Sequence, residues 1–413
     1  MADLGTEVSK ELENARTPEV ANLESGEDIA AGLTIEEKTE TRLVKETKAV
    51  VIDLGTQHCK AGYAGDHKPA YVVSSTVGKH LQATAKTGDN RKETFVGHEL
   101  LNTKMHLKLV NPLQHGIVVD WNCVQDIVEY IFIKEMKIAP EEHAALVSDP
   151  PLSPITNREK YAEMMFEVFG SPAMHIANQS ILSIYSYGRI SGLVIEIGHG
   201  VSYVVPIHEG YMVPNVTERV DYAGSDVSKY LKQLLNDAGH SFTDEDLHMM
   251  DCMKKKCCYV SLDLDYEMGL PPSGYMIDYE LPDGHIITVG KERFLSSEAL
   301  FHPSLLAVNQ PGLHTLAIGS INRCGAALRP VMLGNILLCG GSTVLEGFSE
   351  RFSREMNKAF AREVPVIEAS SERKYTVWRG GSILASLKSF QQLWVSKEEY
   401  DEHGPLVIHK KCF

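Results

Sequence analysis

Two short apolar runs of the sequence end in an acid and a glycine, a pattern typical of a turn that binds phosphate. Val-Ile-Asp-Leu-Gly ends at Gly55, and Val-Ile-Glu-Ile-Gly ends at Gly198, 143 residues later. Small residues let an anion approach the backbone N–H groups of such a turn. Asp53 and Glu196 could hold Mg²⁺ through water, because magnesium prefers oxygen ligands and keeps its water molecules. Lys60 could add a cation to the same anion.

A third apolar run, residues 335–339, ends in the glycine pair Gly340 and Gly341. Glycines would let the base or sugar of a nucleotide lie against the backbone. Taken one at a time, such features are usually only turns, but the three in this order favour a nucleotide site. The echo between the first two turns also indicates an internal duplication, in which two related halves place their turns face to face.

The runs that end in these turns alternate with segments of helical length, and this alternation predicts an α/β fold. The first run reads as a buried strand that enters its turn at Asp53, and a second strand returns through Lys60 and Tyr63. Helices are predicted between the strands, at residues 123–137, 157–169 and 225–238.

The composition is that of a large globular protein. Of the 413 residues, 43% are hydrophobic and 23% are charged, which allows a sizeable core in two or three domains or in one bilobed domain. The net charge of −15 disfavours direct binding to nucleic acid or to an anionic membrane. The sequence contains no run of 18 apolar residues, so no membrane span is expected, and its first 30 residues show no secretory signal.

The eight cysteines are expected to be reduced thiols of a cytosolic or nuclear protein. Cys252, Cys257 and Cys258 lie close enough in sequence to suggest zinc ligation. No second ligand pair follows at a suitable spacing, so buried thiols are the favoured interpretation.

Residues 1–49 differ from the rest of the chain. They contain twelve acids, six bases and no aromatic residue. Such a segment buries too little apolar surface to offset its ordering entropy, so a mostly disordered acidic extension is predicted. A partner-binding arm and a simple solvated tail are both compatible with this composition.

The two turns and the glycine pair resemble, in order and spacing, the two phosphate loops and the adenosine segment of the actin superfamily. The resemblance runs from about residue 49 to the last residue. It includes longer matching stretches: PLQHGIVVD at 112–120, APEEH at 139–143, NREK at 157–160, SPAM at 171–174, YELPDG at 279–284 and GGSILASL at 380–387. The acidic extension and residues 86–97 most resemble the testis-type actin-like proteins, in particular the seventh actin-like subgroup.

This resemblance implies a bilobed α/β fold of the actin, chaperone and hexokinase type, with ATP or ADP and Mg²⁺ between two related lobes. The small lobe would be residues 50–186 with 375–413, and the large lobe residues 187–374. Gln179 stands where the family positions the attacking water. The nucleotide-binding residues carried over from the family are Asp53, Gly55, Thr56, Lys60, Gly198, Gly200, Val201, Lys254, Gly340, Gly341 and Lys374.

Departures from the family pattern gather at the predicted catalytic residues. Glu196 replaces an aspartate and moves its carboxylate outward by about one methylene, on the order of 1.5 Å. His199 replaces a second aspartate, so an anion becomes a group that is neutral or cationic near pH 7. The other departures are Gln57, Tyr203, Lys255 and Leu345. Phosphoryl transfer depends on a positioned water, metal and charge, so little or no hydrolysis is predicted, with Gln179 impaired.

The surfaces that actin uses for assembly also differ. The loop at residues 80–94, apolar at its tip in actin, is polar and basic here, which disfavours homo-filaments. An apolar cleft between the bases of the lobes is retained and predicts docking of actin-binding-type proteins and other actin-like proteins. Its residues would be Tyr185, Ile190, Tyr211, Leu384, Leu387 and Leu393, although the same residues could instead belong partly to the core.

The resemblance therefore predicts a structural, non-enzymatic actin-like protein in the cytoskeleton and cytoplasm of male germ cells, with at most a weak residual ATPase. It would act in spermatid and sperm-head differentiation, without membrane insertion and without direct nucleic-acid contact. Two alternatives stay open: a polymerising ATPase, and a nuclear actin-related subunit of a chromatin complex. The second would place the protein in or near the nucleus of spermatids.

Overall fold

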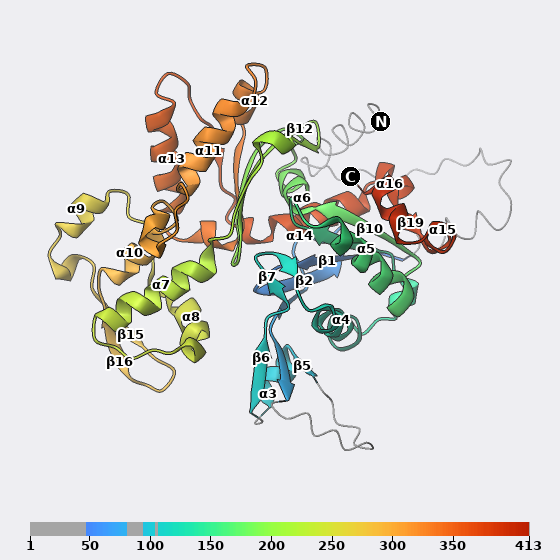
Figure 1. Cartoon of the computed structure of the whole chain (residues 1–413), viewed down its shortest axis with the longest axis horizontal. Coiled ribbons are helices and arrows are strands. Elements are labelled where there is room, and N and C mark those ends of the chain that lie inside the picture. Colours follow the sequence, from blue (N-terminus) through green and yellow to red (C-terminus); the bar gives the residue numbers. More distant parts are fainter. Residues whose placement is uncertain (1–46, 81–93, 104–105, 413) are drawn as a thin grey trace, which may run out of the picture. The chain divides into compact units, whose positions relative to one another are not determined.

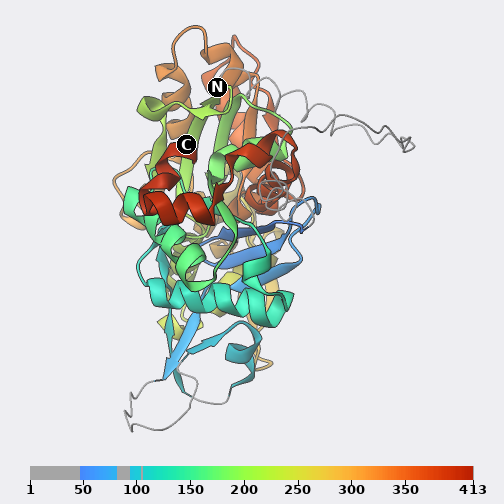
Figure 2. The ribbon, with the colours of Figure 1, turned by 90° about the vertical axis from the view of Figure 1, so that its right-hand side faces the viewer.

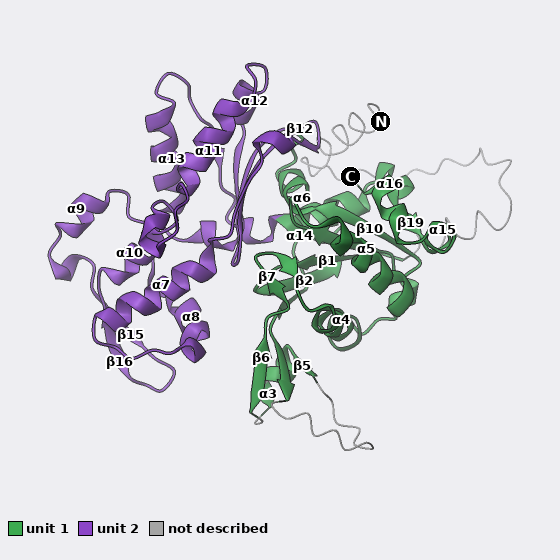
Figure 3. Ribbon diagram, viewed as in Figure 1, with its two compact units in different colours: residues 1–190, 377–413 green, residues 191–376 purple. Residues whose placement is uncertain are grey.

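The computed structural model describes residues 47–80, 94–103 and 106–412. The chain divides into two compact units, which Figure 3 draws in different colours. Unit 1 comprises Met1–Ile190 and Val377–Phe413, and unit 2 comprises Ser191–Thr376. The predicted acidic extension and polar loop lie almost wholly outside the described residues and stay predictions. The division into a small and a large actin-type lobe, and the relationship between these two lobes, also stay predictions.

Unit 1 is built on a six-stranded sheet with the order β19-β10-β9-β1-β2-β3. Its strands are β1 (Val50–Leu54), β2 (His58–Tyr63), β3 (Tyr71–Ser74), β9 (Ala145–Asp149), β10 (Ala173–Asn178) and β19 (Val395–Ser396). β1 pairs antiparallel with β2 and parallel with β9, and β9 pairs parallel with β10. The carboxyl ends of β1, β9 and β10 therefore meet at one edge of the sheet, where ligands bind in open α/β sheets.

Alternate residues of β1 enter two different cores, because successive side chains of a strand point to opposite faces. Val50, Ile52 and Leu54 pack in one core, whereas Val51 packs in the other with Trp378. The helices of unit 1 include α4 (Trp121–Tyr130), η1 (Ile131–Met136), η2 (Pro140–Glu142), α5 (Ile155–Glu163), η3 (Met164–Val168), α6 (Gln179–Ser186), α14 (Thr376–Ser386), η10 (Ser389–Leu393), α15 (Lys397–His403), η11 (Pro405–Val407) and α16 (Ile408–Lys411). The helices predicted at 123–137 and 157–169 are confirmed, each with a π-helical last part.

A smaller sheet projects from the main sheet of unit 1, as Figures 1 and 2 show from two directions. Its order is β5-β4-β6, formed by β4 (Val77–His80), β5 (Thr94–Val96) and β6 (Leu107–Val110), with the short helix α3 (His98–Asn102) beside it. The short hairpin of β7 (Leu113–Gln114) and β8 (Ile117–Val118) precedes α4.

Unit 2 repeats the local pattern of unit 1 around its own sheet, whose order is β13-β12-β11-β17-β18. The strands are β11 (Gly192–Ile197), β12 (Ser202–His208), β13 (Tyr211–Met212), β17 (Ile336–Cys339) and β18 (Ile367–Glu368), and β14 (Glu218–Val220) pairs with β12. β11 pairs antiparallel with β12 and parallel with β17, as β1 does with β2 and β9. A shared strand–turn–strand unit with a parallel neighbour is what an internal duplication predicts.

The helices of unit 2 pack in two groups. α11 (Leu313–Arg323), α12 (Arg329–Leu333) and α13 (Phe348–Ala359) share a core with the sheet, and α11 and α13 lie side by side in Figure 1. α7 (Gly224–Asp237) and α8 (Leu247–Cys257) form a second core with the hairpin of β15 (Ile277–Glu280) and β16 (Ile286–Val289). The helix predicted at 225–238 is confirmed as α7. The remaining α-helices are α9 (Leu264–Met268) and α10 (Glu292–Glu298).

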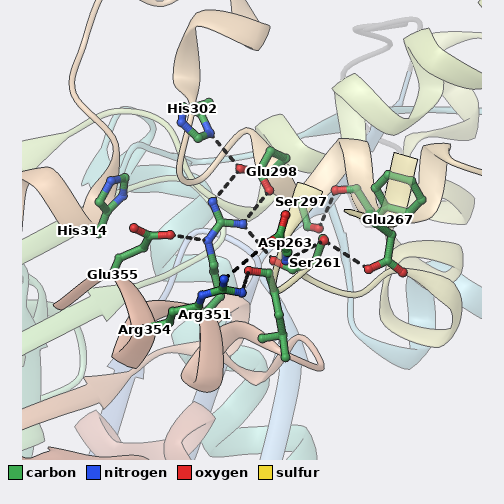
Figure 4. A network of polar contacts seen from close by, with 12 residues as sticks. Ser261, Asp263, Glu267, Ser297, Glu298, His302, His314, Arg351, Arg354 and Glu355 are labelled. Atoms are coloured by element: carbon green, nitrogen blue, oxygen red, sulfur yellow. Dashed lines mark hydrogen bonds and ion pairs between the residues drawn. The ribbon is translucent and has the colours of Figure 1, made fainter. Parts of the chain in front are cut away.

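A buried charge network ties α13 to α10 (Figure 4). Glu298 has no exposed surface, and Arg351 donates two hydrogen bonds of 3.1 and 3.0 Å to its carboxylate. Arg351 also donates to Ser261 O and to Glu355, both at 2.8 Å. His302 Nδ1 lies 2.7 Å from Glu298 Oε1. Loss of the cation would leave a buried carboxylate without its main partner, so breaking this network should destabilise unit 2.

The cysteines are free thiols, and Cys257 and Cys258 are buried, as predicted. Burial raises the pKa of both, that of Cys258 to about 11, so these thiols stay protonated at neutral pH. Cys252 differs from the prediction because it is partly exposed. Of the helices within the described ranges, none is both long and apolar enough to cross a lipid bilayer.

Candidate functional site

The β1–β2 turn of unit 1 carries a chain of polar contacts centred on Asp53. This carboxylate is 2% exposed, and its two oxygens accept hydrogen bonds from Lys60 Nζ at 2.8 Å and from Ser148 Oγ at 2.7 Å. Asp53 and Lys60 are direct cross-strand partners in the β1–β2 hairpin. Gln179 Nε2 donates to the same Ser148 hydroxyl at 3.2 Å. The structure thus brings three predicted site residues together: Lys60 bonds Asp53 directly, and Gln179 is joined to Asp53 through Ser148.

Ser148 is the functional candidate that the sequence analysis missed. It lies next to last in β9, whose carboxyl end meets that of β1 at the sheet edge. Gln179 is the first residue of α6, directly after β10, so all three strands deliver polar groups to one place. The available signal was a serine, followed by Asp149, at the end of an apolar run, but only the strand order shows what its hydroxyl contacts.

The backbone of the same turn is tightly closed. A Cβ on Gly55 would lie 2.9 Å from His58 O, so a larger residue would push the turn open. Thr56 Oγ1 accepts a hydrogen bond from the Gly116 N–H at 3.1 Å. Gln57, which departs from the family pattern, does not take a positive φ. The turn therefore accommodates Gln57 without left-handed backbone.

The β11–β12 turn of unit 2 gathers the second set of predicted residues. Gly198 N–H donates to Val201 O at 3.0 Å, and Gly200 lies between them in the turn. Gly198 O in turn accepts from Ser342 Oγ at 2.6 Å and from the Gly224 N–H at 3.2 Å. The start of α7 and the segment after β17 are thereby fixed to the turn.

The glycine pair of the third run packs directly on β11. Gly340 has a φ of +89°, and a Cβ there would lie 2.3 Å from Ile197 O, so only glycine fits. Gly341 begins the short helix η8 (Gly341–Val344). The Gly340 N–H donates to Arg373 O at 2.9 Å, which brings the helix η9 (Arg373–Tyr375) and the exposed Lys374 next to the pair. Unit 2 therefore collects all of its predicted nucleotide residues around one turn and its neighbours.

Lys254, predicted to bind nucleotide, is surrounded by acceptors of the protein itself, and its role with nucleotide stays a prediction. Its side chain is 6% exposed, and its ammonium donates to Gly224 O at 2.6 Å, to Ser228 Oγ at 2.8 Å and to Asp251 Oδ1 at 2.7 Å. An ammonium has three donors, and the protein itself accepts all three. Asp251 also accepts a hydrogen bond of 2.5 Å from Ser228 and lies 3.6 Å from Lys255.

His199 lies on the turn beside this cluster, with Nδ1 3.9 Å from Asp251 Oδ2. Burial lowers the pKa of His199 to about 4, despite the carboxylate nearby, so the imidazole is neutral at pH 7. Burial acts to raise the pKa of Asp251, but Lys254, His199 and the hydrogen bonds outweigh it and lower that pKa to about 2. Asp251 is therefore ionised at neutral pH, and its carboxylate is bound by lysines and a serine hydroxyl of the protein.

These contacts bear on the predicted Mg²⁺ site. Asp53 already accepts from a lysine and a serine, and Glu196 is 7% exposed with partners of its own. Among the described residues, no group of three His, Cys, Asp or Glu side chains is placed to hold a metal ion. Magnesium held through water at Asp53 and Glu196 therefore stays a prediction.

The other departures from the family pattern are also placed. Tyr203 is 2% exposed in β12 and is the cross-strand partner of Glu196, with Arg219 over its ring at 5.9 Å. Lys255 is about half exposed beside Asp251, and Leu345 packs partly buried against the cores of unit 2.

The residues predicted to line a partner cleft are mostly tied to the core of unit 1. Leu384 is 8% exposed within that core, and Tyr185, Leu387 and Leu393 pack partly buried against it. Ile190 is also partly buried, whereas Tyr211 of unit 2 is 53% exposed. For the residues of unit 1 the structure agrees better with partial core packing than with an open apolar face. Their role with partners stays a prediction.

Comparison with known proteins identifies the family. The actin family model matches residues 44–413. Actin-like protein 7B of Homo sapiens is 59% identical over 382 residues, which cover 92% of this chain and 92% of the relative. Actin-like protein 7A of Homo sapiens is 58% identical over 384 residues, or 92% of this chain and 88% of the relative. Actin-like protein 7B of Mus musculus is 58% identical over 377 residues, or 91% and 90%.

These matches span both units and confirm the actin-type α/β fold predicted from the sequence. Actin-family proteins generally bind a nucleotide with a divalent cation, which agrees with the convergence of turns and glycines within each unit. The chain therefore belongs to the actin family, within its actin-like protein 7 subgroup, as a protein of the cytoskeletal type.

Proposed function

We propose that this protein is a structural, actin-like component of the cytoskeleton of male germ cells, which binds nucleotide but hydrolyses it slowly or not at all. The observation that carries the proposal is the contrast between the two turns. The unit 1 turn keeps the Asp53–Lys60 pair and the contact to Gln179 through Ser148. The unit 2 turn has a neutral His199 where the family has an aspartate.

This contrast supports binding without efficient chemistry. Lys60, paired with Asp53, places a cation beside the closed turn of unit 1, and turns of this kind can bind an anion through backbone N–H groups. By the resemblance to actin, hydrolysis would need a metal and a positioned water, because the reaction is catalysed by positioning and charge. With His199 in the second turn, one anionic anchor for the metal's waters is lost. Bound nucleotide would then act as a stabilising ligand by mass action.

The experiment is to release and quantify whatever nucleotide copurifies with the native protein, and then to follow phosphate release over hours. Stoichiometric ATP without phosphate release would support the proposal, whereas bound ADP with steady release would refute the claim of slow hydrolysis. An empty protein that also fails to bind added Mg-ATP would refute nucleotide binding itself. Conventional actin, treated in parallel, controls for loss of nucleotide during purification.

A polymerising ATPase is the second candidate, and the intact Gln179–Ser148–Asp53 chain favours it. A pelleting assay with Mg-ATP separates the two candidates. Sedimentation of the purified chain into filaments together with phosphate release would support the ATPase. A chain that stays in the supernatant and retains its nucleotide supports the structural protein.

The proposed setting is the cytoplasm and the perinuclear cytoskeleton of spermatids, in assemblies with other actin-like and actin-binding-type proteins. This setting rests on the kinship to actin-like proteins 7A and 7B. Immunostaining of developing germ cells tests it. Label confined to chromatin would favour a nuclear subunit instead, and label around the developing sperm head would support the cytoskeletal role.

A further inference from the structure

The charge cluster of unit 2 indicates how the proposed nucleotide site is regulated. Lys254 belongs to α8, and its ammonium lies beside the start of α7, because it donates to Gly224 O. The Gly224 N–H in turn donates to Gly198 O, so Lys254 is also close to the β11–β12 turn. A lysine in this position would suit a polyanion or a sugar hydroxyl. Its three donors, however, are already bound within 2.8 Å by oxygens of the protein.

The acceptor that distinguishes this arrangement is Asp251. It is 3% exposed, one turn before Lys254 on α8, and bonds to both Lys254 and Ser228. Its second oxygen faces the turn, 3.9 Å from His199 Nδ1. A negative charge at this place opposes a bound polyphosphate and also holds the ammonium that would attract one. Any ligand oxygen that contacts Lys254 must first replace one of its short internal bonds.

We propose that Asp251 is an internal competitor of nucleotide. Its carboxylate binds the Lys254 ammonium and so keeps low the affinity for nucleotide of the unit 2 residues around the β11–β12 turn. The same contact stabilises α7 and α8 without a ligand. This inference rests on the proposed nucleotide site. It identifies Asp251 as the residue that sets how strongly that site binds.

The test is nucleotide affinity after neutralisation of Asp251. Asp251→Asn keeps the size of the side chain and removes its charge, and Asp251→Ser also leaves an acceptor oxygen near Lys254. Both variants should bind ATP about tenfold more tightly than the wild type, the size of one charged hydrogen bond regained. Titration of the full-length chain with a fluorescent ATP analogue gives the dissociation constant. Melting by circular dichroism shows which variants are folded.

Two further variants make the result specific. Asp265→Asn changes the net charge equally at an exposed position on α9, so it should leave the affinity unchanged. Adding Lys254→Gln to Asp251→Asn should abolish the gain, because the gain requires the released ammonium. A gain of equal size in the Asp265 variant, or one that survives Lys254→Gln, would show a general charge effect and overturn the inference.

The outcomes separate this inference from the proposed function. If the wild type binds nucleotide and folded Asp251 variants bind no more tightly, only the inference is overturned. If neither the wild type nor the variants bind at millimolar nucleotide, both are overturned. If only the Asp251 variants bind, the competitor is confirmed, and the wild type is shown to be closed to nucleotide.

Discussion

The buried pair of Arg351 and Glu298 gives the sharpest test of the structure. Arg351→Met keeps most of the side chain's apolar volume and removes the guanidinium. The structure then loses two hydrogen bonds to Glu298, one to Ser261 O and one to Glu355. Glu298 has no exposed surface, so its carboxylate would remain buried with only His302 and weaker partners. Breaking such a pair lowers the free energy of unfolding by about 3–5 kcal/mol.

The loss would appear as a shift in melting temperature. For a unit of this size, each kcal/mol lost lowers the melting temperature by roughly 2–4 °C. The melting temperature of unit 2 should therefore fall by about 10 °C. Far-ultraviolet circular dichroism follows both units. All three tryptophans of the sequence, Trp121, Trp378 and Trp394, belong to unit 1, so their fluorescence follows that unit alone. A drop seen by circular dichroism but not by fluorescence would assign the loss to unit 2.

The matched control is a neighbouring arginine on the same helix (Figure 4). Arg354 and its partner Asp263 are each about half exposed, and an exposed pair contributes at most about 1 kcal/mol. Arg354→Met should therefore change the melting temperature by no more than a few degrees. If Arg351→Met proves as mild as this control, the buried Glu298 carboxylate does not depend on Arg351 and this reasoning is wrong.

Three further predictions follow from buried polar groups. Burial lowers the pKa of His175, His199 and His314 to about 4, so below about pH 6.5 the unfolded chain binds more protons than the folded chain. The free energy of unfolding should thus fall toward pH 4, by up to about 1.4 kcal/mol per pH unit for each histidine. Urea titrations at several pH values measure this, and a flat profile would contradict the burial of these histidines. Ser148→Ala should lower the free energy of unfolding by about 1–3 kcal/mol and weaken nucleotide binding, and Ser148→Thr should restore both. Equal behaviour of the two variants would exclude a role for the hydroxyl. His199→Asp places a second carboxylate about 4 Å from Asp251, so the free energy of unfolding should fall by roughly 2 kcal/mol without divalent cation and recover with Mg²⁺. If Mg²⁺ stabilises the wild type as much as the variant, this reasoning is wrong.

Much of the fold could be predicted because its signals are local. The hairpin that pairs Asp53 with Lys60 closes over a short turn, so the apolar run and its glycine are enough to place it. The helices now seen as α4, α5 and α7 have continuous stretches of suitable length. In each case the residues that decide the structure are neighbours in the sequence, where periodicity and turn chemistry act.

The partners of the site residues could not be predicted in the same way. Lys254 was expected beside a nucleotide, yet its environment depends on Asp251 and on Gly224 at the start of another helix. The apolar residues Leu384 and Leu387 looked like a docking surface, yet packing against Trp378 and its neighbours buries them wholly or in part. Sequence patterns give the polarity of a residue, but its burial depends on which elements cover it.

By itself the sequence determined the class of the protein: an α/β chain with two acid–glycine turns, a glycine pair and altered residues at the second turn. These features are local or compositional, so they do not depend on how distant segments of the chain pack together. Only the tertiary structure decided that Ser148 joins Asp53 to Gln179, that Asp251 holds Lys254, and that one serine hydroxyl, from 144 residues away, closes the second turn. The physical reason is that a buried polar group must find a partner, and the strand order and helix packing decide which partner is within reach.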